Sequence, residues 1–385
     1  LLFTGHLMTD VAQGIVPALL PYFISEYHLT YSAAGFLILA LTASSSIVQP
    51  VFGYLADRKS LPGFVALGPF LAGLGIAVTG LFHQYYLIVA GVFLCGLGAA
   101  AFHPEGARLA GIAAGKKKAS GMSLFSVGGN AGFALGPIIA AGLILLFGLK
   151  GIGLYFFPAL AVAVILFQAA TRLSGLSTLE ENQGHNTVIN TSLHHEKEEQ
   201  WLPFILLTLA IICRSILMQS FNTFLPSYWI ETFHSSKEVA NLVLTALLGM
   251  GVVGNLVGGV LADRFGNKRM VFLGYILLIP QLLIFAHLTE AIPAVLLLMT
   301  IGFTIYTTFS PMIVLGQQFL PGRVGFASGI TIGLAVSVGG FAAPVLGRLA
   351  DLAGVHSVFY LAVLFPILAA LLMYPLVKRK KVVSC

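Results

Sequence analysis

Apolar segments about 20 residues long recur along the whole chain, and they constrain its fold more than any other feature. A helix needs roughly 20 apolar residues to cross the hydrocarbon core of a bilayer. The predicted spans are 1–24, 31–55, 63–82, 85–109, 120–147, 151–171, 202–228, 238–261, 270–288, 292–315, 325–347 and 355–377. The sequence therefore predicts an all-α polytopic membrane protein with twelve transmembrane helices.

The composition excludes an ordinary soluble domain. Of the 385 residues, 58% are hydrophobic and 9% are charged, whereas soluble domains carry about 25% charged residues. The net charge of +6 comes from short basic runs between apolar segments, which indicate membrane topology and no nucleic-acid partner. The three cysteines are far apart, so no disulfide framework is expected. Leu1 lies inside an apolar run, so we expect the chain to begin within its first spanning helix, without a cleavable signal peptide.

The distribution of basic residues predicts the orientation. One set of loops carries Arg58, Lys59, Lys116 to Lys118, Arg264, Lys268, Arg269, Arg323 and Lys378 to Lys381. The opposite set carries only Lys150 and Lys237, with Arg348 near a helix end. Because cytoplasmic loops are enriched in lysine and arginine, both termini are expected to face the cytoplasm.

A single long polar tract divides the chain into halves. We predict a six-helix bundle over 1–172, a cytoplasmic linker loop over 173–200, and a second six-helix bundle with a short basic tail over 201–385. His194 and His195 lie in this tract beside Glu196, and its composition indicates a solvated linker. No metal site is predicted there or elsewhere.

The two halves repeat one another. Residues 53–58 read GYLADR and residues 259–264 read GVLADR, an offset of 206. Pro21 pairs with Pro226 at an offset of 205, and Pro137 with Pro344 at 207. A nearly constant offset indicates two copies of one six-helix unit, which is the architecture of parallel-repeat transporters.

The repeated GxLADR resembles the loop signature of the major facilitator superfamily. This resemblance implies two pseudo-symmetric six-helix bundles, alternating access, and a cytoplasmic gate held by Asp57, Arg58, Asp263 and Arg264. The copy at 259–269 is complete, whereas the first copy departs from the signature after Arg58. Residues 128–137, GGNAGFALGP, are similar to the glycine-proline signature of the superfamily's drug/proton antiporters. Gly132, Gly136 and Pro137 are accordingly assigned to gating.

Other residues resemble a narrower family. Residues 101–105 (AFHPE) with Arg108, residues 123–132 (SLFSVGGNAG), and His6 with Asp10 are similar to the fosmidomycin resistance protein family. The resemblance implies a bacterial inner-membrane exporter that uses the proton gradient to expel a phosphonate antibiotic. Its partners would be protons, an anionic small molecule and the lipid bilayer. The protein is expected to be a monomer without a cofactor.

Asp10 is the leading candidate proton carrier. It lies about 21 Å from the outer end of its helix at 1.5 Å per residue, hence near mid-membrane. A carboxyl group away from water favours its neutral form, so it can bind and release a proton. The alternative is a structural aspartate paired with a neighbouring helix.

Arg214 lies near the midplane of the seventh predicted helix. The 205 offset maps Asp10 onto Ser215, so Asp10 and Arg214 occupy nearly equivalent places in the two halves. A fixed guanidinium there would attract an anion such as a phosphonate through charge and forked hydrogen bonds. The alternative is a structural ion pair with a carboxylate, Asp10 included.

Glu105 and Arg108 are three residues apart on one helix, so they can pair. Pro104 is expected to open the helix locally. His103 lies on a different side of the helix and is expected not to join the pair. Glu105 corresponds to Pro311 in the second half, so this acid is particular to the first half.

These observations predict a proton-coupled antiporter that exports a small anionic drug. Proton coupling is assigned to Asp10, Glu105 and His103, and substrate binding to Arg214, Arg108, His6, Gln13 and Asn222. One alternative is a proton-coupled importer of a sugar, organic acid or phosphate ester. A membrane-embedded enzyme is disfavoured, because the chain has neither an HExxH zinc motif nor a GxSxG nucleophile elbow.

Overall fold

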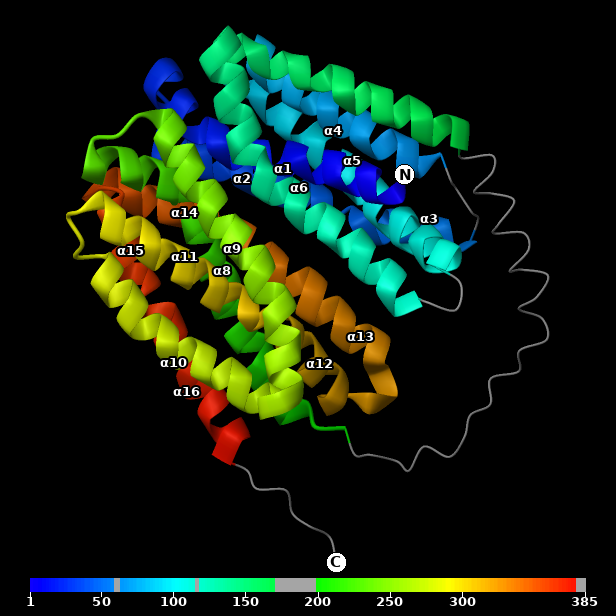
Figure 1. The fold of residues 1–385 in the computed structure, drawn as a ribbon, viewed down its shortest axis with the longest axis vertical. Coiled ribbons are helices and arrows are strands. Elements are labelled where there is room, and N and C mark those ends of the chain that lie inside the picture. The colour runs from blue at the N-terminus through cyan, green and yellow to red at the C-terminus, as the bar shows by residue number, and fades with distance from the viewer. Residues whose placement is uncertain (59–62, 115–117, 170–198, 379–385) are drawn as a thin grey trace, which may run out of the picture. The chain divides into compact units, whose positions relative to one another are not determined.

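Long helices form where the sequence predicts apolar spans. The computed structural model describes residues 1–58, 63–114, 118–169 and 199–378, and the regular structure in these ranges is helical (Figure 1). Within them, eleven segments are long and apolar enough to cross a membrane. The predicted all-α membrane fold is confirmed. The predicted linker at 173–200 lies outside the described residues except for its last two positions.

The contacts divide the chain into two compact units. The first unit comprises Leu1–Leu29 and Phe36–His194, and the second comprises Thr30–Gly35 and His195–Cys385. Helix α1 is the centre of the first unit: it packs along α6 and also contacts α4 and α5 (Figure 1). The helices of this part are α1 (Leu2–Tyr27), α2 (Tyr31–Ser46, of which the residues up to Gly35 are grouped with the second unit), α3 (Gln49–Arg58), α4 (Phe64–Leu81), α5 (Tyr85–Ala114) and α6 (Lys118–Phe147). They are followed by the span Leu149–Ala169, which opens with a 3₁₀ turn over Leu149–Tyr155.

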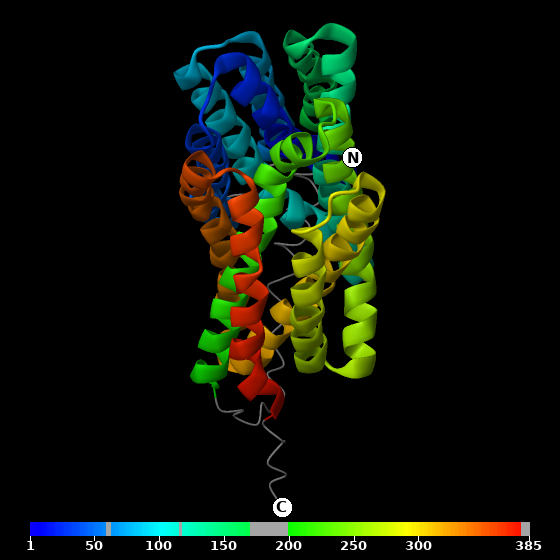
Figure 2. The same ribbon diagram turned by 90° about the vertical axis from the view of Figure 1, so that its left-hand side faces the viewer.

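In the second unit α8 packs against α14 and α16, and α9 packs against α11. Figure 2 shows α16 (red) running beside α8 (green). The helices are α8 (Trp201–Phe233), α9 (Lys237–Phe265), α10 (Asn267–Phe285), α11 (Ala291–Thr307), α12 (Phe309–Phe319), α13 (Val324–Ser328), α14 (Ala335–Ala353), α15 (His356–Ala362) and α16 (Leu364–Lys378), with a 3₁₀ turn over Pro321–Arg323.

Prolines account for three breaks inside predicted spans. A proline has no N–H to donate to the carbonyl four residues earlier, so that helical hydrogen bond is lost. In three spans the helix ends at the residue four positions before a proline. The pairs are Pro50 with Ser46, Pro311 with Thr307, and Pro366 with Ala362. Pro104 behaves differently from the prediction, because α5 continues through it. Neighbouring helices α1, α3, α4 and α6 pack along α5, so the missing bond does not end the helix.

The predicted span 325–347 is the least regular. It consists of the short α13, a π-helical turn over Gly329–Leu334, and then α14. It is the one predicted span that is missing from the eleven described segments that meet the length and hydropathy criteria. A π turn interrupts the regular hydrogen-bond ladder and is frequently found at functional sites.

Glycines allow α1 and α6 to approach closely. A methyl group added at Gly132 would overlap the backbone of Leu7, and one at Gly136 would overlap the backbone of Gly14. The same contact recurs in the second unit, where a methyl group at Gly339 of α14 would overlap Ser215 of α8. Gly132 and Gly339 are 207 residues apart, the offset of the sequence repeat. Small residues at such crossings let helices pack backbone to backbone in membranes.

We expect Gly136→Ala to lower thermal stability, because its methyl group forces α1 and α6 apart. Overpacking of this kind costs about 1–3 kcal/mol. The measurement is thermal unfolding of the purified protein in detergent. Gly142→Ala, on the same helix, is the matched control because nothing lies within 4 Å of its added methyl group. Equal unfolding temperatures for the two variants would contradict the close-packing argument.

Candidate functional site

Asp10 of α1 is the centre of a polar cluster inside the first unit. Its Oδ1 accepts a hydrogen bond from Gln13 Nε2 at 2.6 Å and lies 3.0 Å from His103 Nε2. Its Oδ2 lies 3.3 Å from His6 Nε2. His6 and Gln13 share a face of α1 with Asp10, as their spacing indicates, whereas His103 is supplied by α5. We call these four residues the Asp10 cluster.

His6 is held in place by Phe125 of a third helix, α6. Its Nδ1 lies 2.7 Å from the backbone oxygen of Phe125 on α6, and its ring stacks on the Phe125 ring with centroids 4.1 Å apart. Phe102 of α5 lies on another side of the imidazole, with centroids 5.7 Å apart. The imidazole is therefore fixed in both position and rotation.

Gly129 of α6 provides the space for this arrangement. A methyl group there would overlap His6 Nε2 and Asp10 Oδ2. The His6–Asp10 contact thus occupies the place that any larger residue at position 129 would fill. Because α6 lies close to α1, the side chains of His6 and Asp10 pack against the backbone of Gly129.

Three members of the cluster have side chains that also bind transition metals. One ligand atom from each of His6, Asp10 and His103 lies within 4.8 Å of the others. His103 Nε2 lies at hydrogen-bond distance from Asp10, 3.0 Å, and His6 Nε2 lies 3.3 Å away, within the range of an imidazole–carboxylate ion pair. Direct contacts between the side chains therefore explain why the three groups lie so close together.

Glu105 and Arg108 form the pair that their spacing predicts. Arg108 donates from Nε to Glu105 Oε2 at 2.9 Å and from an Nη atom to Oε1 at 2.7 Å. The Glu105 side chain is fully buried, whereas that of Arg108 is 27% exposed. His103 does not join this pair and contacts Asp10 instead. The assignments of Glu105 to proton coupling and of Arg108 to substrate stay predictions.

Arg214 of α8 is a buried cation of the second unit. Its Nε donates to the backbone oxygen of Ile305 at 3.0 Å. The guanidinium carbon lies 5.0 Å from the ring centroid of Phe309 and 5.6 Å from that of Tyr306. Within the described ranges no carboxylate forms an ion pair with it, so the structural ion pair considered as the alternative is not found among the described residues. Aromatic faces attract the cation but leave its charge uncompensated.

Asn222 lies two helical turns beyond Arg214 on α8. It is buried, and its Oδ1 has no hydrogen-bond partner in the part of the chain that the structure describes. Gln219, on the same helix, donates to Thr223 Oγ1 at 2.8 Å. A buried amide oxygen without a partner carries an energetic penalty that a bound donor would remove. This fits the predicted role of Asn222 in binding substrate without testing it.

A sequence model of the Major Facilitator Superfamily matches residues 2–344, and a second match covers residues 207–384. The chain belongs to the major facilitator superfamily. It is a multi-pass membrane transporter, as both the repeated loop motif and the helices indicate.

Relatives within the superfamily agree with the narrower resemblance. The uncharacterized MFS-type transporter YfnC of Bacillus subtilis is 33% identical over 95% of this chain and 89% of its own length. The fosmidomycin resistance protein of Escherichia coli is 30% identical over 96% of this chain and 90% of its own. The quinolone resistance protein NorA of Staphylococcus aureus is 25% identical over 91% and 89%. Both resemblances found in the sequence are thereby confirmed.

Solved transporters share the fold. A bacterial homologue of the human lysosomal transporter Spinster, in an inward-facing and occupied conformation, superposes with a TM-score of 0.80 at 12% identity, covering 98% of this chain and 95% of that one. The nucleoside transporter NupG has a TM-score of 0.74 at 14% identity, covering 98% of both chains. At this level of identity the likeness concerns the fold alone.

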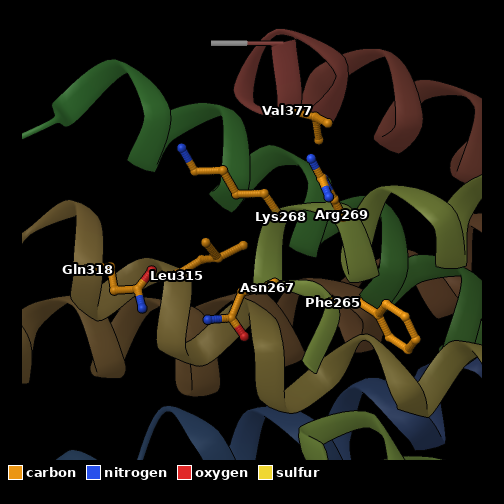
Figure 3. Close-up of a pocket in the computed structure, with 8 residues that line it drawn as sticks. Phe265, Asn267, Lys268, Arg269, Leu315, Gln318 and Val377 are labelled. Carbon is orange, nitrogen blue, oxygen red and sulfur yellow. The ribbon is translucent and has the colours of Figure 1, made fainter. Parts of the chain in front are cut away.

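The loop motif of the superfamily ends α9 and begins α10. Asp263 and Arg264 are exposed in the last turn of α9. Figure 3 shows Lys268 and Arg269 extending from the start of α10 beside a pocket of about 410 Å³. The pocket is also lined by Phe265, Gly266, Asn267, Leu315, Gln318 and Val377.

Asp57 and Arg58 belong to α3, and their side chains lie outside the described structure. The gating roles of all four motif residues, and of Gly132, Gly136 and Pro137, stay predictions.

The sequence does not identify three contributors to these sites. The backbone oxygen and the ring of Phe125 orient His6, and the sequence assigns Phe125 no role at a site. Phe309 flanks Arg214, and Gly129 makes room for the His6–Asp10 contact. The GGNAG run marks α6 as a close-packing helix, which points to Gly129 only once the facing residue is known. No sequence signal indicates Phe309, because its contact with Arg214 depends on how α12 packs on α8.

We expect Glu105→Gln and Arg108→Ala to lower the unfolding temperature individually, and their double variant to lose less than the sum. Removing Arg108 takes the two-hydrogen-bond partner from the fully buried Glu105 carboxylate, and Glu105→Gln removes the charge that holds the pair. The coupling is on the order of 1–3 kcal/mol. Thermal unfolding in detergent measures the cycle. Arg323→Ala is the control, because its pair with Glu199 is exposed and contributes about 0–1 kcal/mol. Additive losses at 105 and 108 would contradict a coupled buried pair.

Proposed function

We propose that the protein is a proton-coupled exporter of a small anion, with a phosphonate such as fosmidomycin as cargo, working by alternating access. The Asp10 cluster is the observation that carries this proposal. Ionisable side chains are rare in spanning helices and mark proton relays or substrate pathways in transporters. Here two imidazoles and a carboxylate meet on one side of α1.

The cluster has the features of a proton-binding site. Its members exchange hydrogen bonds across α1 and α5, so adding or removing one proton changes how the helices are joined. The side chains of His6, Asp10 and His103 are 12%, 14% and 23% exposed, so none of the three is fully enclosed by the protein. Histidine changes charge between about pH 5 and 8, the range in which transmembrane proton gradients operate.

Arg214 supports an anionic cargo. Among the described residues no carboxylate forms an ion pair with this buried guanidinium, so its Nη groups can donate to an oxyanion such as a phosphonate or carboxylate. Asn222 adds a buried amide nearby on the same helix, with an unused oxygen that suits a cargo hydroxyl or amide.

The relatives support export of a drug. The fosmidomycin resistance protein and NorA are both named for resistance, which efflux explains, and both align with nearly the whole chain. Proton-coupled import of an organic acid or phosphate ester would use a similar cluster and cation, so an experiment must determine the direction of transport.

We place the protein in the bacterial inner membrane as a monomer, with both termini cytoplasmic and the proton gradient in place of a cofactor.

We expect Asp10→Asn to abolish gradient-driven export, because an amide in place of the carboxylate dismantles the proton-binding cluster. Inside-out membrane vesicles with an acidic lumen should accumulate fosmidomycin when they carry the wild-type protein, and should not when they carry the variant. Glu290→Gln, an exposed carboxylate, is the matched control and should keep accumulation. Unchanged accumulation in Asp10→Asn would reject the cluster as the coupling site. Proton-driven loss of preloaded fosmidomycin by the wild type would show import instead of export.

We expect Arg214→Ala to weaken fosmidomycin binding about 10- to 100-fold, the equivalent of roughly 1.5–3 kcal/mol for hydrogen bonds to a charged group. Arg214→Lys should show a smaller loss, because it keeps the charge but not the fork. Equilibrium dialysis with the purified protein measures the affinity, and Arg323→Ala is the control for loss of an exposed arginine. Undiminished affinity in Arg214→Ala would return this arginine to a structural role.

A further inference from the structure

We propose that His6 carries the exchangeable proton of the cluster, while Asp10 stays ionised as its partner. This inference rests on the proposed proton coupling and deepens it, because it assigns the proton to a residue that the sequence places among the substrate ligands. The argument depends on which atoms around His6 can donate a hydrogen bond and which can only accept one.

The contact with Phe125 fixes one ring nitrogen of His6. A backbone carbonyl oxygen can only accept a hydrogen bond, so Nδ1, at 2.7 Å, must be the protonated donor. The stacked Phe125 ring prevents the imidazole from turning over. Nε2 is therefore the only atom of His6 that can gain or lose a proton without breaking this contact.

Nε2 faces Asp10 Oδ2, an oxygen that, when the carboxylate is ionised, can only accept a hydrogen bond. In neutral His6 with Nδ1 protonated, Nε2 carries a lone pair, and it lies 3.3 Å from Asp10 Oδ2. Two acceptors at that distance repel each other, so the contact as observed requires a proton between them. That proton comes from water to the Nε2 lone pair and returns to water when it leaves, so the step creates and removes one imidazolium charge.

The neighbours of Asp10 favour the proton on nitrogen. Gln13 Nε2 donates to Oδ1 at 2.6 Å, and His103 Nε2 lies 3.0 Å from the same oxygen. Hydrogen bonds donated to a carboxylate stabilise its ionised form. His103 can make its contact as a neutral imidazole with Nε2 protonated, so it needs no second proton. His6 is the member whose contact fails without one.

Few other ionisable groups face the pair from the helices packed on α1. Helix α4 has none over Phe64–Leu81, and α6 has none over Leu124–Phe147. Helix α5 contributes His103 and Cys95, with Glu105 and Arg108 already paired to each other. The following span contributes Tyr155, whose hydroxyl bonds to the backbone oxygen of Met8. Asp10 is therefore the charged group that interacts directly with His6 when its imidazole gains or loses a proton.

Release of the proton also bears on helix packing. Gly129 holds the backbone of α6 directly against the His6–Asp10 contact. Once Nε2 loses its proton, the attraction between His6 and Asp10 becomes a repulsion at a point where α6 packs directly on these two side chains of α1. Proton exchange at His6 thus acts on the α1–α6 crossing.

The infrared arm of the test identifies the protonated group. pH-difference infrared spectra of the purified full-length protein in lipid should contain an imidazole signal that His6→Gln removes and that His83→Gln, at an exposed site, preserves. They should contain no carboxylic-acid C=O band that Asp10→Asn removes. A carboxylic-acid band that disappears in Asp10→Asn and persists in His6→Gln would overturn the inference.

The transport arm uses fosmidomycin in the inside-out vesicles described above. His6→Gln should lose gradient-driven accumulation while it keeps exchange of internal for external fosmidomycin. Gly129→Ala, which keeps all ionisable groups, should likewise lose gradient-driven accumulation and keep exchange. Gly142→Ala should behave as wild type. Normal, pH-dependent accumulation in His6→Gln, with loss in Asp10→Asn, would overturn the inference and leave the proposed function standing. Absence of gradient-driven accumulation in the wild type would overturn the proposed function itself, and the infrared arm would still decide which group binds the proton.

Discussion

The first unit depends on how a carboxylate is accommodated within spanning helices. An isolated Asp10 in an apolar helix would be strongly unfavourable, because the charge loses its hydration. The protein surrounds it with Gln13 from its own helix and His103 from α5, and sets His6 against the other oxygen. His6 is oriented toward Asp10 because α6 comes close enough for Phe125 to contact its ring. Charge accommodation and helix packing are therefore one arrangement.

Glycine has a chemical as well as a packing role in this arrangement. At Gly132 and Gly136 it lets the backbones of α1 and α6 meet, which is a general device of membrane helices. At Gly129 it leaves room for an ionisable pair in place of a methyl group. The glycine-rich run of α6 thus serves both the stability of the first unit and the geometry of its titratable site.

The two units share a scaffold but differ in the charge that they bury. Gly132 of α6 and Gly339 of α14 make equivalent close contacts, at the offset of the sequence repeat. Near the position equivalent to Asp10, the second unit has the cation of Arg214, held by a carbonyl and two aromatic rings. Duplication preserved the crossing of the helices, while the ionisable side chains diverged. The first unit thus buries a carboxylate beside two imidazoles, whereas the second buries a guanidinium.

Much of this protein followed from the sequence by itself. Hydropathy determined the all-α membrane fold, since a bilayer leaves the backbone few alternatives, and the offset repeat with its GxLADR motif identified the superfamily. The spacing of Glu105 and Arg108 was sufficient to pair them, because residues three apart on one helix are neighbours. The breaks before Pro50, Pro311 and Pro366 were not separable in advance from the continuous helix at Pro104, since packing decides whether a helix survives the lost bond. Only the tertiary structure brought His6 to Phe125, 119 residues away, and His103 to Asp10, 93 residues away. Those contacts depend on the rotation and separation of α1, α5 and α6, which many small packing interactions set jointly and no local pattern records.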